Sequence, residues 1–296
     1  MKKTCTLIMV LVAMLVTPEL QAVEFAYDAG AELVSSYLWR GQYNGGLSLQ
    51  PDVEIGYDGD LSSLRFGVWG SVGASDWAFV SGRPVTEDGN PNTYFVPELD
   101  VVLNFNICGL MLGATHYYYF GGSPFFNWRS VDDIVATEGT SQTEVTIGYD
   151  FRNKCELPLT ITWNTMVAGN DLIEDENGDL KRAFSTYIEA KYDQPLPLDM
   201  TLSLALGISP WKSAIYNTGA WNEETNTVEI KNFAVNNISI RLEKEWEFDA
   251  CSISLFGQGM LNTCGLTKET AFVWAAGDDK LCMQKVNGTI GVGVWF

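Results

Sequence analysis

Charged side chains recur at every second position in several otherwise apolar segments of this 296-residue chain. Glu98 and Asp100 form one such pair, and Arg241 and Glu243 form another. Side chains two residues apart in a strand point to the same face of a sheet. A face that mixes carboxylates with basic groups can line a water-filled passage and contact ions or polar solutes. The residues predicted to line such a passage are Glu32, Arg40, Asp52, Glu54, Arg65, Glu98, Asp100, Glu144, Arg152, Glu189, Lys191, Arg241 and Glu243.

The sequence contains few of the residues that a hydrolytic enzyme or a metal site requires. An activated serine requires a base beside its hydroxyl group, and His116 is the only histidine. His116 is followed by three tyrosines and has no serine–asparagine companion beside it. The cysteine spacing is not that of a zinc site either. The sequence therefore predicts no enzyme, no metal site and no cofactor.

The composition argues against a helical membrane protein. Hydrophobic residues make up 46% of the chain, yet the mean hydropathy is only +0.01. Membrane helices would need several apolar runs of about 20 residues each, and only one long apolar run occurs, at the start of the chain. Elsewhere apolar and polar residues are interleaved, as the strands of a membrane barrel require.

The first residues have the features of a secretory signal peptide. Two lysines precede the apolar core Thr6–Val16, and Leu20-Gln21-Ala22 then leads to a cleavage site after Ala22. We therefore expect residues 1–22 to be removed as a signal peptide and residues 23–296 to form a single barrel domain.

The remaining chain is strongly acidic. Removing the two lysines and one glutamate of the signal peptide changes the net charge from -19 to -20. Such a chain does not bind nucleic acid by neutralising phosphates. An acidic surface favours cations or lipopolysaccharide bridged by divalent cations. The simpler explanation is that acidic loops keep an exported protein soluble.

Export also permits disulfide bonds, because the compartments outside the cytoplasm are oxidising. Cys264 and Cys282 flank the last long loop, and a disulfide between them is predicted to hold that loop. Cys108 and Cys155 lie at neighbouring turns and form a second candidate pair, which leaves Cys251 unpaired.

The last eleven residues show the pattern on which the fold prediction rests. Val286, Ile290 and Val292 fall on one face of a period-two segment, and Asn287 and Thr289 fall on the other. Eleven earlier segments alternate in a similar way. The twelve predicted strands are residues 29–40, 47–57, 63–75, 94–107, 110–120, 141–152, 159–169, 182–193, 199–210, 233–248, 251–262 and 286–296.

The connections between these segments predict the topology. After the first pair of strands, long polar loops alternate with short turns. This is typical of an all-β, antiparallel transmembrane β-barrel in the cell outer membrane, with short periplasmic turns and long extracellular loops. In the first strand, Leu33, Tyr37 and Trp39 are predicted to face lipid, while Glu32 and Arg40 face the lumen.

Two local features resemble known outer-membrane proteins. The block Ser35–Gln42, followed by Leu49-Gln50-Pro51 and Phe66–Ser71, resembles the TorF family of porin-like proteins over roughly residues 29–75. This resemblance implies an outer-membrane barrel with a transport role and carries over no catalytic residues. The aromatic end Trp295-Phe296 resembles the C-terminal signal strand of such barrels, which the barrel-assembly machinery reads.

Together these features predict a passive channel for small polar solutes. Its other expected partners are outer-membrane lipid, lipopolysaccharide and the barrel-assembly machinery. The alternative is a barrel that conducts nothing and binds a partner, glycan or surface ligand through its loops. The loop aromatic residues that would serve this role are Trp77, Phe125, Phe126, Trp128, Trp211, Trp221 and Trp274.

Overall fold

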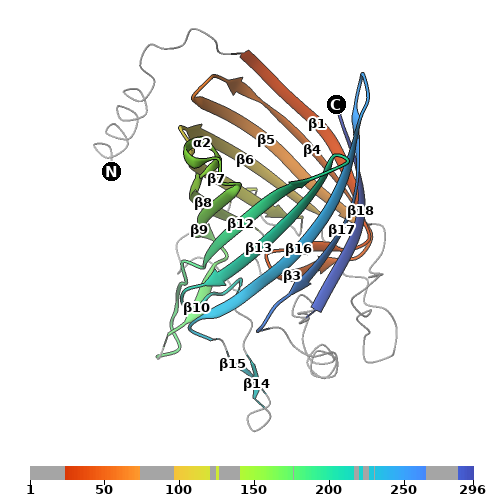
Figure 1. Cartoon of the computed structure of the whole chain (residues 1–296). Coiled ribbons are helices and arrows are strands. Elements are labelled where there is room, and N and C mark those ends of the chain that lie inside the picture. Colours follow the sequence, from red (N-terminus) through yellow and green to blue (C-terminus); the bar gives the residue numbers. More distant parts are fainter. Residues whose placement is uncertain are drawn as a thin grey trace, which may run out of the picture.

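A computed structural model shows that twelve antiparallel strands close into a barrel (Figure 1). The structure describes residues 24–73, 97–120, 125–126, 141–175, 177–216, 220–222, 227–229, 231–264 and 286–296. The barrel strands are β1 (Glu24–Val34), β4 (Ser48–Asp58), β5 (Ser62–Gly73), β6 (Glu98–Ile107), β7 (Leu110–Tyr119), β8 (Ser141–Asp150), β9 (Leu159–Gly169), β12 (Thr186–Leu196), β13 (Met200–Ser209), β16 (Ala234–Glu247), β17 (Ser252–Leu261) and β18 (Val286–Trp295).

The first and last strands close the barrel. β1 pairs with β18 from Gly30 opposite Trp295 to Val34 opposite Gly291, and the Phe296 amide donates to the Ala29 carbonyl at 2.8 Å. Closure pairs the backbone groups that an open edge would leave exposed, which is the condition for a sheet to span a bilayer. The predicted fold class is confirmed.

Side chains alternate between the two sides of this wall. In β4 the exposed fraction of Val53 is 50%, whereas Asp52 and Glu54 point into the lumen. The terminal strand behaves as predicted, with Ile290 and Val292 exposed outside and Asn287 buried inside. Exposed aromatic rings follow the periplasmic end of the outer surface, as they do at membrane interfaces; they are Phe25, Tyr27, Tyr57, Trp246, Phe248 and Phe296.

The barrel is a closed sheet with an apolar outer belt and a polar interior, and this arrangement places it in the outer membrane. No helix within the described residues is long and apolar enough to cross a membrane. Residues 1–22, predicted as a signal peptide, lie outside the described residues.

Short turns gather at one end of the barrel, at the top of Figure 1, and long connections at the other. The short helix α2 (Arg152–Cys155) lies between β8 and β9 at the turn end. At the opposite end, the hairpins β10–β11 (Leu172–Glu174 and Leu180–Arg182) and β14–β15 (Ala220–Asn222 and Thr227–Glu229) extend two of the long connections.

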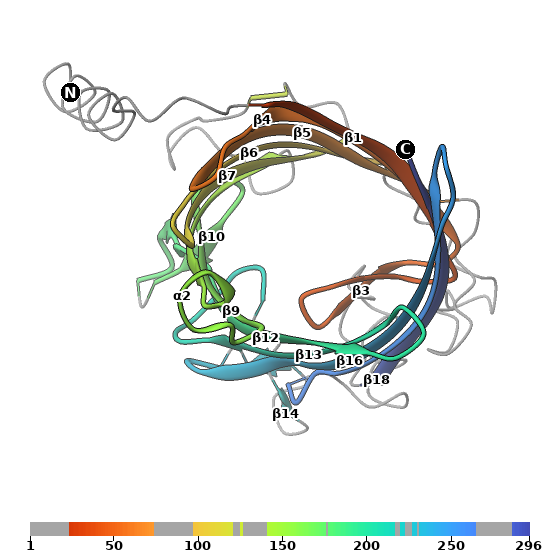
Figure 2. The ribbon, with the colours of Figure 1, turned by 45° about the horizontal axis from the view of Figure 1, so that its top comes forward.

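The first connection corrects the sequence-based prediction. The first strand ends at Val34 rather than residue 40, and the chain then forms a second hairpin, β2 (Tyr37–Trp39) and β3 (Gln42–Gly45). This β2–β3 hairpin projects into the barrel opening (Figure 2). The first pair of strands is therefore joined by a long connection, so the alternation of long loops and short turns has no exception.

Tyr37 and Trp39 consequently do not face lipid, and that prediction was wrong. Tyr37 is buried against Trp69 of β5, with the two ring centres 5.4 Å apart. Trp39 packs edge-on against Tyr117 of β7 at 5.5 Å. An alternating pattern describes a strand inside the lumen as well as one in the wall, because both place successive side chains on opposite faces.

Candidate functional site

The inner face of the barrel carries most of the charged residues singled out from the sequence. Alternation along the strands places these twelve in the lumen or on the hairpin inside it: Glu32, Arg40, Asp52, Glu54, Arg65, Glu98, Asp100, Glu144, Glu189, Lys191, Arg241 and Glu243. Arg152 differs, because β8 ends at Asp150 and Arg152 belongs to α2 at the periplasmic turn. Its side chain is 52% exposed and pairs with Asp150 at 3.0 Å.

Three basic side chains of the wall, Arg65, Lys191 and Arg241, form ion pairs with carboxylates of the lumen face, some of them on strands that are not neighbours. Arg65 contacts Asp58 and also reaches Asp28 at 3.1 Å. Lys191 lies 3.3 Å from Asp193 on β12.

Arg241 combines two carboxylates with an aromatic ring. Its guanidinium lies 3.1 Å from Glu32 and 3.1 Å from Glu243. The same guanidinium sits 3.4 Å from the centre of the inward-facing Phe256 ring. A cation over an aromatic face gains electrostatic attraction beyond that of the ion pair.

The tip of the β2–β3 hairpin places Arg40 in a similar but more buried setting. Its guanidinium forms a bidentate ion pair with Glu144 of β8, in which Nη2 lies 2.8 Å from Oε1 and Nη1 contacts Oε2. Tyr216 donates its hydroxyl to Glu144 at 2.8 Å, and Tyr117 donates to the other carboxylate oxygen at 3.2 Å. Only 1% of the Glu144 side chain is exposed.

Aromatic rings surround the same guanidinium. Its central carbon lies 4.8 Å from the Trp39 ring, 5.0 Å from Tyr187 and 5.6 Å from Tyr216. Burial alone lowers the pKa of Arg40, but Glu144 and the tyrosine hydroxyls more than offset this and hold the pKa well above its ordinary value. Arg40 is therefore a fixed positive charge inside the barrel.

Backbone conformation lets the hairpin reach this position. Arg40 and Gly41 both adopt positive φ, 47° and 87°. A Cβ on Gly41 would lie 1.8 Å from the Asn236 carbonyl oxygen, so only glycine fits there. The Asn262 side-chain amide donates to the Gly41 carbonyl at 3.1 Å, and the Gln42 side-chain amide donates to the Ile215 carbonyl.

The base of the hairpin is held on the other side of the barrel. The Ser35 amide donates to the Ile290 carbonyl of β18 at 2.9 Å, and the Ser36 amide donates to the Thr289 hydroxyl at 3.1 Å. In the strand order, β18 and β8 lie on nearly opposite sides. The hairpin and the Arg40 side chain together therefore span the lumen, from the base of the hairpin at β18 to Glu144 on β8.

A second group of carboxylates has no basic partner. Five of the lumen carboxylates singled out from the sequence form no ion pair among the described residues: Asp52, Glu54, Glu98, Asp100 and Glu189. Tyr37 and Tyr119 hydrogen-bond to Glu98. Burial, reinforced by Glu98 and Asp100, raises the pKa of Tyr37 well above its ordinary value, so its hydroxyl stays a donor.

Sequence reasoning missed the aromatic partners. Tyr117 and Tyr187 stand at alternating positions of their strands, on the same face as the charged residues, and this parity could have identified them. Tyr216 lies in the irregular segment after β13, where no periodicity marks its direction. The tyrosine hydroxyl that approaches Arg40 most closely could be found only from the tertiary structure.

The residues considered for enzyme or disulfide chemistry lie elsewhere. His116 is buried on the outer side of β7; its Nδ1 lies 2.8 Å from the Thr143 hydroxyl and its Nε2 lies 2.7 Å from the Phe125 carbonyl. The thiols of Cys108 and Cys155 are free and exposed, so that pair forms no disulfide. Cys282 lies outside the described residues, and its pairing with Cys264 stays a prediction. No group of three or more His, Cys, Asp and Glu side chains in the described ranges is arranged to hold a metal.

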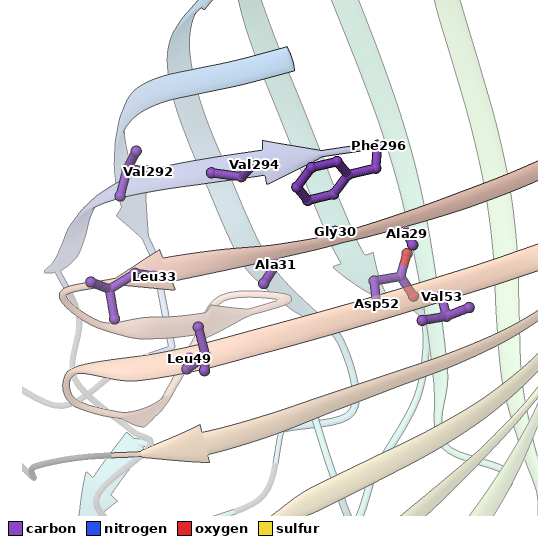
Figure 3. A pocket seen from close by; sticks show the side chains of 10 residues that line it. All are labelled: Ala29, Gly30, Ala31, Leu33, Leu49, Asp52, Val53, Val292, Val294 and Phe296. Carbon is purple, nitrogen blue, oxygen red and sulfur yellow. The ribbon is translucent and has the colours of Figure 1, made fainter. Parts of the chain in front are cut away.

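The seam between β18, β1 and β4 carries an apolar groove of about 450 Å³ on the outer surface (Figure 3). Small side chains at Ala29 and Ala31 form its floor, and Phe296 lies at one end. Trp295 points the other way, inward over Gly30, where a Cβ would lie 2.3 Å from the indole. The groove faces lipid and is separate from the lumen site. A role of Trp295 and Phe296 as an assembly signal stays a prediction.

No family model and no curated protein matches this sequence, so the resemblance to the TorF family is not confirmed. Similar solved structures include the NanC porin, which is 9% identical over 92% of this chain and 99% of that chain, with a TM-score of 0.43. An outer membrane channel from Pseudomonas putida F1 is 13% identical over 95% and 98%, with a TM-score of 0.40. The outer membrane phospholipase of Salmonella typhi is 9% identical over 96% of each chain, with a TM-score of 0.36. At these identities the likeness concerns the fold alone.

Proposed function

We propose that this protein is a passive channel for small polar solutes, with the β2–β3 hairpin as its constriction. The observation that carries the proposal is the polar lumen crossed by a hairpin that is held from both ends. A barrel of about twelve strands is wider than one that side chains alone fill. A narrow aqueous path beside the hairpin therefore suits small solutes better than large ones.

The hairpin sequence supports the same proposal. Tyr37-Leu38-Trp39-Arg40-Gly41 belongs to the block Ser35–Gln42 that resembles the TorF family, and these residues form the hairpin that projects into the barrel opening. Its Trp39 and Arg40 side chains occupy space that a simple extracellular loop would leave to water.

Planar-bilayer recording with the purified, refolded protein tests this function. We expect discrete single-channel steps in potassium chloride, together with passage of small but not large neutral sugars in liposome swelling. Folding is verified by the heat-dependent shift of the barrel on gels. If the folded barrel gives neither conductance steps nor liposome swelling, the channel proposal is overturned and the loop-binding alternative is favoured. A lipase assay on the same sample tests for hydrolytic activity.

A further inference from the structure

We propose that one side of the lumen wall binds organic ammonium ions through alternating carboxylates and aromatic rings. This inference names the solute class of the proposed channel and rests on it for transport, while binding itself can be measured separately. The site, which we call the acid–aromatic row, consists of Trp295, Asp52, Trp69, Asp100 and Tyr117.

Strand register brings these residues into one line. Gly30 of β1 pairs with Trp295 on one side and Asp52 on the other. Asp52 is opposite Trp69, Trp69 is opposite Asp100, and Asp100 is opposite Tyr117. Directly opposed residues share one face of the sheet, and for these strands it is the lumen face. Because Gly30 has no side chain, the Trp295 indole covers it.

Asp100 supplies the polar group that lacks a partner. Its exposed fraction is 7%, and its Oδ1 atom is buried without a hydrogen bond to any residue that the structure describes. A buried polar atom of this kind is costly unless something satisfies it. Tyr37 closes one side of the row through its contact with Trp69, and Glu98 adds a further carboxylate two residues before Asp100.

Two arginine side chains of the barrel are already bound by carboxylates together with aromatic rings. Arg241 sits between two carboxylates over Phe256, and Arg40 pairs with Glu144 inside a group of aromatic rings. The acid–aromatic row has the same combination of groups, yet no basic side chain of the described chain forms an ion pair with Asp52 or Asp100. A cation from solution would complete it in the same way.

The aromatic rings select the class of cation. Weakly hydrated organic ammonium groups bind well to the faces of Trp and Tyr, and quaternary ammonium is the best example. A divalent metal prefers several oxygen ligands at short range, and the described residues hold no group of three or more ligands for a metal. The alternation of rings with single carboxylates therefore fits an organic cation.

Calorimetric titration of the detergent-purified, folded full-length barrel with choline chloride tests the binding. We expect choline to bind and its neutral isostere dimethylbutanol not to bind. Trp69→Leu and Asp100→Asn should each weaken choline binding by about tenfold. Trp163→Leu, on the outer face, and Asp193→Asn, a lumen carboxylate paired with Lys191, are the matched controls and should retain the wild-type affinity.

The outcomes separate this inference from the channel function. Choline that binds to a folded barrel without measurable conductance supports the row and contradicts the channel. Conductance that choline neither carries nor blocks, with no binding heat, overturns the row and leaves the channel standing. Choline binding that is unchanged in folded Trp69→Leu and Asp100→Asn variants also overturns the row, because the cation then binds elsewhere.

Discussion

Two parts of the lumen contain the same types of side chain, but the charges are paired in only one of them. At the hairpin tip, Arg40 and Glu144 neutralise each other, and the Tyr117 and Tyr216 hydroxyls donate to the same two carboxylate oxygens. Along the acid–aromatic row, Asp52 and Asp100 lie beside Trp69 without a basic partner. The first arrangement holds a structural element in place. The second leaves Asp52 and Asp100 on the lumen face without an ion pair among the described residues.

The comparison teaches that a charged residue in a lumen need not contact solute. Arg40 is the most distinctive basic residue of the sequence motif, yet its charge is paired with Glu144 in the contact that holds the hairpin. If the proposed channel conducts ions, the carboxylates without ion pairs are the groups that set the electrostatic field along its path. Variants of the two regions should therefore change different properties.

Glu144→Ala should have the largest effect on stability. It leaves the buried Arg40 without its counter-charge, and loss of one partner from a buried pair costs about 3–5 kcal/mol. The temperature of the gel shift should fall, and conductance should rise as the hairpin detaches. Glu243→Ala is the control, because Arg241 keeps Glu32 and a partly exposed pair contributes at most about 1 kcal/mol. Equal melting of the two variants would show that Arg40 does not hold the hairpin.

Gly41→Ala should have the next largest effect on stability. The positive φ and the clash with the Asn236 carbonyl cost about 1–3 kcal/mol. Because the hairpin rather than the wall is strained, we expect larger single-channel conductance with a barrel that still folds. Gly178→Ala is the matched control, since its φ is 83° but nothing lies within 4 Å of the added Cβ. If both variants conduct like the wild type, the hairpin tip does not narrow the path.

A smaller effect is expected for ion selectivity. The double substitution Asp52→Asn with Glu54→Gln should reduce the cation-to-anion permeability ratio about twofold, because neither carboxylate forms an ion pair with a basic side chain of the described chain. The reversal potential in a potassium chloride gradient measures this ratio. Glu32→Gln with Asp193→Asn removes the same number of charges from paired positions and should change the ratio less. The opposite ranking would mean that ion pairing does not decide which carboxylates a permeating ion feels.

Arg152→Ala should change least. Its ion pair with Asp150 is half-exposed at the periplasmic turn, and such pairs contribute about 0.5 kcal/mol or less. Neither the unfolding temperature nor the reversal potential should move measurably. A clear shift in selectivity would instead place Arg152 in the conduction path, as the sequence alone had predicted.

The amino-acid sequence by itself determined the barrel and its two faces. Alternation is a local property, because each side chain in a strand points opposite to its neighbours, so Asp52 and Val53 could be assigned to opposite sides without knowing the fold. Turn residues and loop lengths then predicted which strands are neighbours, and antiparallel pairing of sequential strands followed.

Only the tertiary structure decided what those faces do. The pattern Tyr37-Leu38-Trp39-Arg40 alternates like a wall strand, and nothing local shows that it leaves the wall and crosses the lumen. Arg40 and Glu144 are 104 positions apart, and Arg40 and Tyr216 are 176 apart. Closure of the barrel sets these contacts and the register of the acid–aromatic row, because both depend on how distant strands align and on where the connecting chain can fit.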